Sequence, residues 1–90
     1  MSVETAAVVG GGTMGNGIAH VFALHGYDVT LVDVDESVLE DARSTIEGNL
    51  SRQVKKDVIA TEDRSAALDR LAFTTETPEG VASADLVVEA

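Results

Sequence analysis

The chain has 90 residues, and its 16 acidic and 6 basic side chains give a formal net charge of −10 at pH 7. This length fits one small domain, and the acidic balance makes nucleic acid and anionic membranes poor partners. The absence of cysteine excludes a disulfide framework. No apolar run approaches the roughly 18 residues of a membrane span, and the first residues carry no basic leader, so we expect a cytoplasmic protein.

A glycine-rich segment follows the first apolar run, at 6–9, which predicts a strand. Gly10, Gly12 and Gly15 have the spacing G-x-G-x-x-G. In a dinucleotide-binding turn, the first glycine permits the turn, the second admits a pyrophosphate and the third lets helix and strand pack closely. The amides and dipole of the helix that follows would stabilise the phosphates without a basic side chain. By itself, the spacing also fits an ordinary loop.

A helix and a second strand are predicted after the turn. The apolar residues Ile18, Ala19, Phe22 and Ala23 repeat at helical spacing, and Gly26 after His25 fits a C-terminal cap. The strand predicted over 29–33 ends on Asp33, 18 positions after Gly15. A carboxylate there would accept hydrogen bonds from both adenosine ribose hydroxyls and repel a 2′-phosphate, which favours NAD over NADP. Alternatively, Asp33 is the N-terminal acid of a helix.

Three further elements complete the expected fold. Asp35 is expected to cap a long amphipathic helix with the apolar repeat Val38, Leu39, Ala42, Ile46, Leu50 and Val54. Thr61 is expected to cap another helix, which contains Ala66, Ala67, Leu68 and Leu71, although Leu71 also fits a third strand over 71–74. Pro78 predicts a short helical turn through Val81 before a fourth strand at 86–89. These elements predict an α/β, Rossmann-type doubly wound parallel sheet, represented by its first, adenosine-binding half plus the fourth strand.

The glycine segment, residues 26–29 and 31–33, and the closing Ala-Asp-Leu-Val-Val-Glu-Ala together resemble the N-terminal NAD-binding domain of 3-hydroxyacyl-CoA dehydrogenases. The resemblance spans essentially the whole chain. It implies NAD as cofactor, with Asp33 at the adenosine ribose and a pyrophosphate-binding segment made of Gly10, Gly11, Gly12, Thr13, Met14, Gly15, Asn16 and Gly17.

The resemblance also implies a contact with the CoA part of the substrate. A lysine late in the family's second helix meets CoA, and that position falls on Lys56. Lys55 and Lys56 are the only lysines, so they form a local positive spot that would attract phosphates; alternatively, they only complement the helix dipole. Where the family often has a CoA-contacting serine, this chain has Asn49, whose amide can still donate and accept hydrogen bonds.

No catalytic residue is expected within this chain. The family's catalytic histidine and its partner glutamate lie beyond residue 90, and we expect structural or surface roles for His20 and His25. No metal-binding spacing is present. We interpret residues 1–90 as the N-terminal part of an NAD-binding Rossmann domain whose remainder, together with a helical C-terminal domain, is absent. The resemblance implies a homodimeric parent enzyme of fatty-acid or butanoate metabolism that oxidises the 3-hydroxyl of an acyl-CoA to a 3-keto group.

Two alternatives stay open. A regulatory Rossmann-type module without catalysis, such as those that gate transporters, also has a glycine turn and an acid at the end of the second strand. The acidic surface, for its part, indicates either adaptation to high salt, where charges are screened, or an ordinary acidic cytosolic protein.

Overall fold

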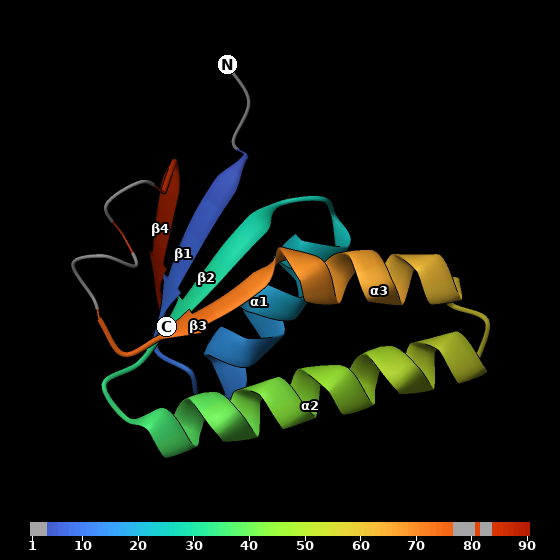
Figure 1. Cartoon of the computed structure of the whole chain (residues 1–90), viewed down its shortest axis with the longest axis horizontal. Coiled ribbons are helices and arrows are strands. Elements are labelled where there is room, and N and C mark those ends of the chain that lie inside the picture. The colour runs from blue at the N-terminus through green and yellow to red at the C-terminus, as the bar shows by residue number, and fades with distance from the viewer. Residues whose placement is uncertain (1–3, 77–80, 82–83) are drawn as a thin grey trace.

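The computed structural model describes residues 4–76, 81 and 84–90. Within them the chain forms β1 (Thr5–Val9), α1 (Thr13–Leu24), β2 (Asp28–Val32), α2 (Glu36–Lys55), α3 (Thr61–Arg70), β3 (Leu71–Thr74) and β4 (Leu86–Glu89), as Figure 1 shows. Helices follow β1 and β2 before the next strand begins, and the strands pair in parallel, which is the pattern of an α/β fold with a parallel sheet. The predicted fold class is therefore confirmed.

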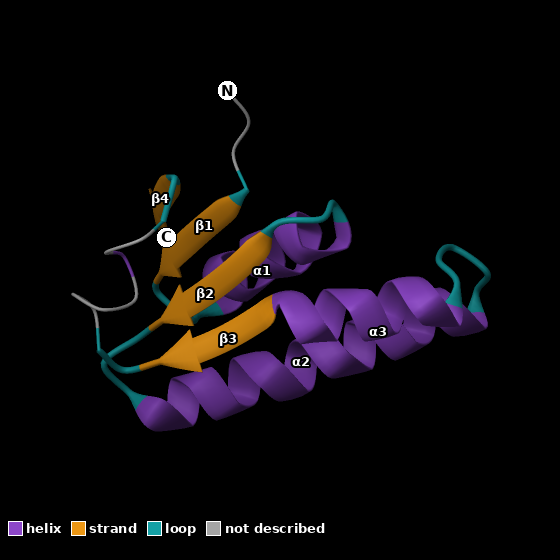
Figure 2. Ribbon diagram, turned by 45° about the horizontal axis from the view of Figure 1, so that its top comes forward, coloured by secondary structure: helices purple, strands orange, loops and turns teal. Residues whose placement is uncertain are grey.

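The four strands make one parallel sheet in the order β3-β2-β1-β4 (Figure 2). In this register Val8 of β1 lies between Leu31 of β2 and Val88 of β4. The chain first builds outwards from β1 to β3 and then returns to the other side of β1. This reversal is the topological switch point at which doubly wound sheets bind their ligands.

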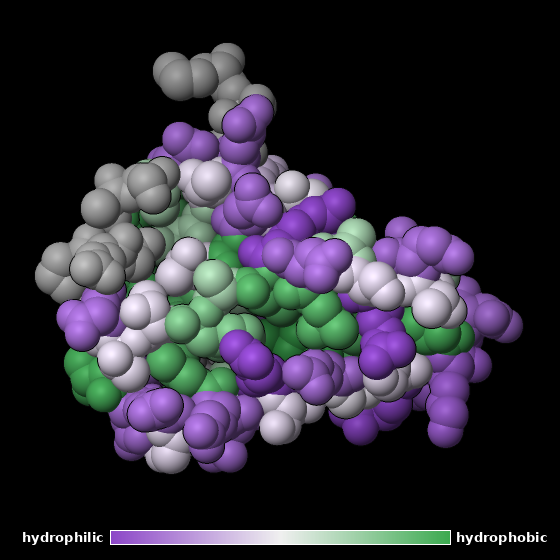
Figure 3. Space-filling view, in the orientation of Figure 1, coloured by the Kyte–Doolittle hydropathy of each residue, from purple (hydrophilic) through white to green (hydrophobic). Residues whose placement is uncertain are grey.

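The three helices pack on one face of the sheet, because alternate strand residues point to it. Val8, Val29 and Leu31 form a single buried cluster with residues of all three helices, namely Ala19, Ala23, Leu39, Ala42, Ile46, Leu50 and Ala67. Each of these ten side chains is at most 5% exposed. Figure 3 shows apolar side chains over the middle of the molecule and polar side chains along the outer turns of α2. The apolar repeat predicted for the long helix thus supplies much of the core.

The local signals at the helix ends are largely confirmed. The Asp35 side chain caps α2 by accepting hydrogen bonds from the Ser37 amide and hydroxyl, at 2.9 and 2.7 Å. Gly26, just past α1, has a φ of +96°, a conformation that glycine adopts without strain. Both residues therefore set helix boundaries as predicted.

Two boundaries differ from the prediction. Thr61 does not cap α3: Ala60 occupies the cap position, and its amide donates to the Asp63 carboxylate at 2.9 Å, so the acid two residues after Thr61 supplies the cap. β2 ends at Val32, so Asp33 is the first residue beyond the strand.

Leu71 belongs to β3, which follows α3 without a loop. The turn predicted from Pro78 lies outside the described residues except for Val81, which is helical.

Candidate functional site

The glycine turn lies at the carboxyl end of β1, between the carboxyl ends of β2 and β4. The Gly10 amide donates to the Val32 carbonyl at 2.7 Å, and the Ala90 amide donates to the Val9 carbonyl at 2.9 Å. These bonds continue the sheet pairing on both sides of the turn. The predicted cofactor segment is therefore held at the switch point of the sheet.

The three glycines of the motif differ in their surroundings. Gly10 has a φ of +109°, and a Cβ on it would lie 2.7 Å from the Ala90 carbonyl oxygen. A Cβ on Gly15 would lie 1.6 Å from the Gly10 carbonyl oxygen, so α1 packs on the turn through bare backbone. A Cβ on Gly12, by contrast, would meet no atom of the described residues within 4 Å. The packing of the backbone therefore requires glycine at positions 10 and 15, whereas the space beside Gly12 is open to a ligand.

The N-terminus of α1 begins at this open space. Gly12 is its cap residue; no side chain caps the helix, and no acid occupies its first turn. Thr13, Met14 and Gly17 are exposed, with Met14 69% accessible, and the Asn16 amide closes the first helical turn on the Gly12 carbonyl at 2.9 Å. The positive end of the helix dipole is thus left for an anion.

Asp33 joins the end of β2 to the glycine turn. One carboxylate oxygen accepts a hydrogen bond from the Gly11 amide at 2.9 Å, and the other accepts one from the Asp35 amide at 2.9 Å. The Gly11 bond, followed by that of Asp35, lowers the pKa of Asp33 below its ordinary value of 3.8. The side chain is therefore a fixed anion at neutral pH, next to the turn, as an acceptor for hydroxyl groups must be.

Asn49 and Lys56 line a separate cavity between α1 and α2. Its volume is about 330 Å³, and its walls are His20, Asn49, Arg52, Gln53 and Lys56. Lys56 is the first residue after α2, and Asn49 lies two helical turns before it. The structure thus brings together the two residues singled out for CoA, and it adds Arg52, Gln53 and His20, which the sequence did not indicate.

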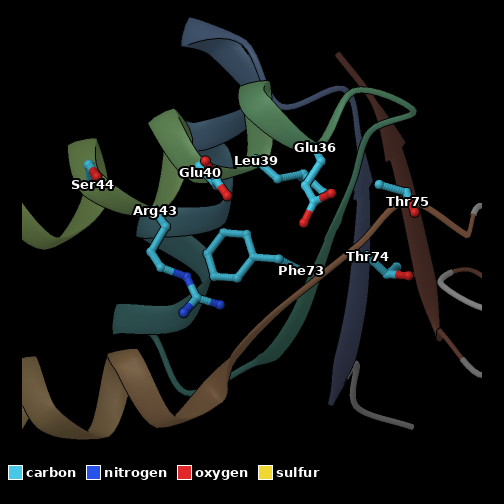
Figure 4. A pocket seen from close by; sticks show the side chains of 8 residues that line it. All are labelled: Glu36, Leu39, Glu40, Arg43, Ser44, Phe73, Thr74 and Thr75. Carbon is cyan, nitrogen blue, oxygen red and sulfur yellow. The ribbon is translucent and has the colours of Figure 1, made fainter.

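A larger groove of about 630 Å³ lies between α2 and the edge strand β3 (Figure 4). The Arg43 guanidinium stands 4.7 Å from the centre of the Phe73 ring, and Glu36 and Glu40 line the same groove. Two carboxylates beside one guanidinium make a poor environment for a phosphate. This groove is therefore not our candidate for the cofactor or for CoA.

Asp85 is an important side chain that is not among the residues predicted from the sequence. Its carboxylate accepts hydrogen bonds from the Glu4 amide at 3.0 Å and from the Thr5 amide and hydroxyl at 3.2 Å. These bonds join the start of β4 to the start of β1 and lower the pKa of Asp85 below 3.8. The cluster lies at the amino end of the strands, away from the glycine turn, so its role is structural. An acid directly before a strand is the one sequence signal that could have drawn attention to it.

The other features considered in the sequence do not add to the candidate site. His25 is exposed and bonds to the Val21 carbonyl one turn back, at 2.8 Å. Within the described residues, no three histidine, cysteine, aspartate or glutamate side chains gather closely enough to hold a metal ion. No helix in the described part of the chain has both the length and the apolar composition needed to cross a membrane.

The fold and the turn define the class of this protein. A parallel sheet, a glycine turn at its switch point and an anionic side chain at the end of β2 are the marks of a Rossmann-type dinucleotide-binding domain. The family described as "3-hydroxyacyl-CoA dehydrogenase, NAD binding domain" matches residues 5–90. The chain belongs to this family, and its cofactor is NAD.

Similarity to known proteins, in sequence and in structure, supports this family assignment. The chain is 46% identical, over 97% of its length, to a 3-hydroxybutyryl-CoA dehydrogenase of Bradyrhizobium diazoefficiens, and 40% identical over its full length to a 3-hydroxyadipyl-CoA dehydrogenase of Escherichia coli. Its fold matches the crystal structure of (S)-3-hydroxybutyryl-CoA dehydrogenase PaaH1 from Ralstonia eutropha with a TM-score of 0.93, 35% identity and 99% coverage of the chain. The chain spans 29%, 19% and 31% of these three proteins.

Proposed function

We propose that this chain binds the adenosine half of NAD within a 3-hydroxyacyl-CoA dehydrogenase that oxidises the 3-hydroxyl of an acyl-CoA to a 3-keto group. The observation that carries the proposal is the hydrogen bond from the Gly11 amide to the Asp33 carboxylate, 2.9 Å long. This bond couples the glycine turn, which suits phosphate, to a fixed anion, which suits a ribose diol. The reaction class comes from the relatives, which are 3-hydroxybutyryl-CoA and 3-hydroxyadipyl-CoA dehydrogenases.

The residues of the turn have distinct roles in this proposal. The space beside Gly12 admits a pyrophosphate, and the first-turn amides of α1, from Thr13 onwards, donate hydrogen bonds to it. Gly10 and Gly15 keep the turn and the helix close, Asn16 and Gly17 continue α1, and Met14 flanks the phosphates with an exposed apolar side chain. When bound, NAD accepts the hydride of the reaction.

Asp33 orients the adenosine ribose by accepting hydrogen bonds from its two hydroxyls. Its lowered pKa keeps the carboxylate charged, so a 2′-phosphate at the same place would be repelled. This charge selects NAD over NADP.

The CoA part of the substrate is assigned to the cavity between α1 and α2. Lys56 supplies a positive charge to a CoA phosphate, and Asn49 supplies an amide donor where the family often has serine. The alternative of a regulatory module without catalysis lacks such support, because the relatives reported above are dehydrogenases.

A binding experiment on the 90-residue chain tests the cofactor part of the proposal. In calorimetric titrations, we expect ADP-ribose to bind about as well as NAD, because the residues that face a ligand here recognise only the adenosine, ribose and pyrophosphate. We expect no oxidation of NADH with acetoacetyl-CoA, followed by NADH absorbance, whereas the full-length parent enzyme turns over. Failure of both nucleotides to bind would refute the assignment, and turnover by the isolated chain would show that a catalytic group lies within it.

The acidic surface further supports the proposal of a protein adapted to concentrated salt. Nine acids of the helices and the loops beside them are all exposed: Asp35, Glu36, Glu40, Asp41, Glu47, Asp57, Glu62, Asp63 and Asp69. Charges so placed repel one another at low ionic strength, and salt screens that repulsion.

A further inference from the structure

The cavity between α1 and α2 contains two side-chain amides, and a neighbouring donor occupies the oxygen of each. Asn49 Oδ1 accepts a hydrogen bond from Arg52 Nη2, one turn further along α2. Gln53 Oε1 lies 2.9 Å from His20 Nε2 of α1. An amide oxygen can only accept, so the His20 nitrogen in this pair is the donor.

These two bonds determine what the amides can offer to a ligand. With both oxygens occupied, each amide has its NH₂ group left for other partners. Neither amide nitrogen donates to another atom among the residues that the structure describes. The Arg52 guanidinium and the Lys56 ammonium, which also line the cavity, carry donors and no acceptor, so among the lining side chains the only acceptor left unoccupied is the second ring nitrogen of a neutral His20.

We infer that this cavity is a donor-rich seat for a phosphate group, in which His20 and Arg52 are positioning residues that hold Gln53 and Asn49 as donors. The inference rests on the proposed assignment of CoA to this cavity and extends it to His20, Arg52 and Gln53. Phosphate oxygens are acceptors, so an amide that turned its oxygen to the cavity would repel the ligand. His20 is only 8% exposed, and this burial restricts the imidazole, so that it can hold its partner in one orientation.

The other charged groups near His20 leave the cavity positively charged. Arg52 and Lys56 of α2 line the cavity with it. From α3, which also packs on α1, Arg70 donates to the Ala23 carbonyl at 2.8 Å and is thereby engaged. Among the residues that the structure describes, no acidic side chain lines the cavity. The seat is therefore positive, in a molecule whose net charge is −10.

Binding of CoA and of inorganic pyrophosphate, measured by calorimetry on the 90-residue chain, tests the inference. Gln53→Glu replaces a donor with an acceptor of the same shape, and we expect at least a tenfold loss of affinity. The control Thr45→Glu places the same charge on the exposed face of α2, and we expect less than a twofold change. An equal effect of the two substitutions would overturn the inference.

His20 itself is tested by a pair of substitutions. His20→Leu leaves the Gln53 amide free to turn, and we expect a threefold to tenfold weaker affinity with the melting temperature kept within a few degrees. His20→Gln restores a donor to Gln53 Oε1 and should recover most of the affinity, whereas His25→Leu, at the exposed histidine, should have no effect. Leucine and glutamine variants of equal affinity would show that His20 merely fills space.

The two probes separate this inference from the CoA assignment. If pyrophosphate binds with the expected order of variants and CoA does not bind, the seat stands and the CoA assignment fails. If CoA binds and Lys56→Ala weakens it while the His20 and Gln53 variants do not, the CoA assignment stands and the inference fails. If neither probe binds, both are wrong.

Discussion

The Asp33 carboxylate stabilises the glycine turn, and in the proposed function the same carboxylate binds the ligand. Its bonds to the Gly11 and Asp35 amides hold the turn in place before any nucleotide arrives. An acceptor that is already oriented and charged loses little freedom on binding, so preorganisation adds to affinity. Any substitution at Asp33 must therefore be compared with one that keeps its shape.

The first prediction concerns the choice between NAD and NADP. Asp33→Asn keeps the shape but removes the charge, so we expect about tenfold weaker NAD binding, the equivalent of about 1.4 kcal/mol, and a smaller difference between NAD and NADP. Asp33→Ser should reduce the difference further, because it also removes the bulk that a 2′-phosphate would meet. Calorimetric titration of both nucleotides measures this. Equal affinities in the unaltered chain would contradict the role of Asp33.

The second prediction separates ligand space from packing space in the glycine turn. Gly12→Val should fold but abolish nucleotide binding, because no described residue lies close to the new side chain, whereas the bound pyrophosphate would clash with it. Gly15→Ala should unfold the domain or destabilise it by about 3 kcal/mol or more, because its Cβ would overlap the Gly10 carbonyl. Circular dichroism and titration distinguish the two.

Gly48 of α2 offers a control outside the glycine turn. A Cβ there meets no atom of the described residues within 4 Å, so Gly48→Ala should keep nucleotide binding and stabilise α2 by about 1 kcal/mol. Unchanged NAD affinity in Gly12→Val would mean that the segment is only a turn.

At the level of elements, the sheet depends on joining strands that are distant in the chain. Asp85 joins β4 to β1 through partners 80 and 81 residues away, and β4 has Leu86 and Val87 39% and 46% exposed. In the described sheet β4 pairs with β1 along one edge only. An edge strand with few buried side chains relies on such anchoring bonds.

The third prediction is a dependence of stability on pH. The bonds from the Glu4 and Thr5 amides lower the pKa of Asp85 in the folded state below its ordinary value of 3.8. Its contribution to the free energy of unfolding is therefore complete above about pH 5 and is lost as the pH falls through the folded-state pKa. Urea denaturation between pH 7 and pH 3 should show a smaller loss of stability in Asp85→Asn than in the unaltered chain.

Asp28 provides the control for that experiment. It pairs in register with Thr5 from the other side of β1 and is exposed, but its carboxylate bonds to no amide in the described part of the chain. Asp28→Asn should therefore keep the original pH dependence. Identical profiles for the two variants would show that Asp85 is not the anchoring group.

At the scale of the whole molecule, charge dominates. The net charge of −10 is carried by a chain of 90 residues whose sheet and helices place the acids outside. At 0.1 M salt the Debye length is about 10 Å, comparable to the spacing of such charges, whereas at 1 M it is about 3 Å. Mutual repulsion is therefore a cost to folding that depends on ionic strength.

The fourth prediction is that raising potassium chloride from 0.05 to 2 M increases the melting temperature by several degrees, measured by circular dichroism. Glycerol at matched water activity should not reproduce the increase, since it does not screen charge. A flat or falling dependence would reject the salt-adapted interpretation and leave the cofactor assignment unaffected.

The sequence by itself determined the elements and the position of the cofactor turn, because these signals lie in neighbouring residues. The apolar repeat from Leu39 to Leu50 predicts the buried side of α2, and the spacing of Gly10, Gly12 and Gly15 predicts the turn before any partner is known. The cap residue of α3 was predicted wrongly, as Thr61 instead of the adjacent Ala60. The helix begins one residue earlier because the Ala60 amide donates to the Asp63 carboxylate.

The tertiary structure decided which of these residues meet. The bonds of Gly11 with Asp33, His20 with Gln53 and Thr5 with Asp85 span 22, 33 and 80 positions. No local pattern encodes such pairs, because they form only when parallel strands align in one register and α1 packs on α2. The family resemblance singled out Lys56 and Asn49, and only packing joined them with His20 in a single cavity, because a side chain's neighbours across two helices follow from the crossing of the helices.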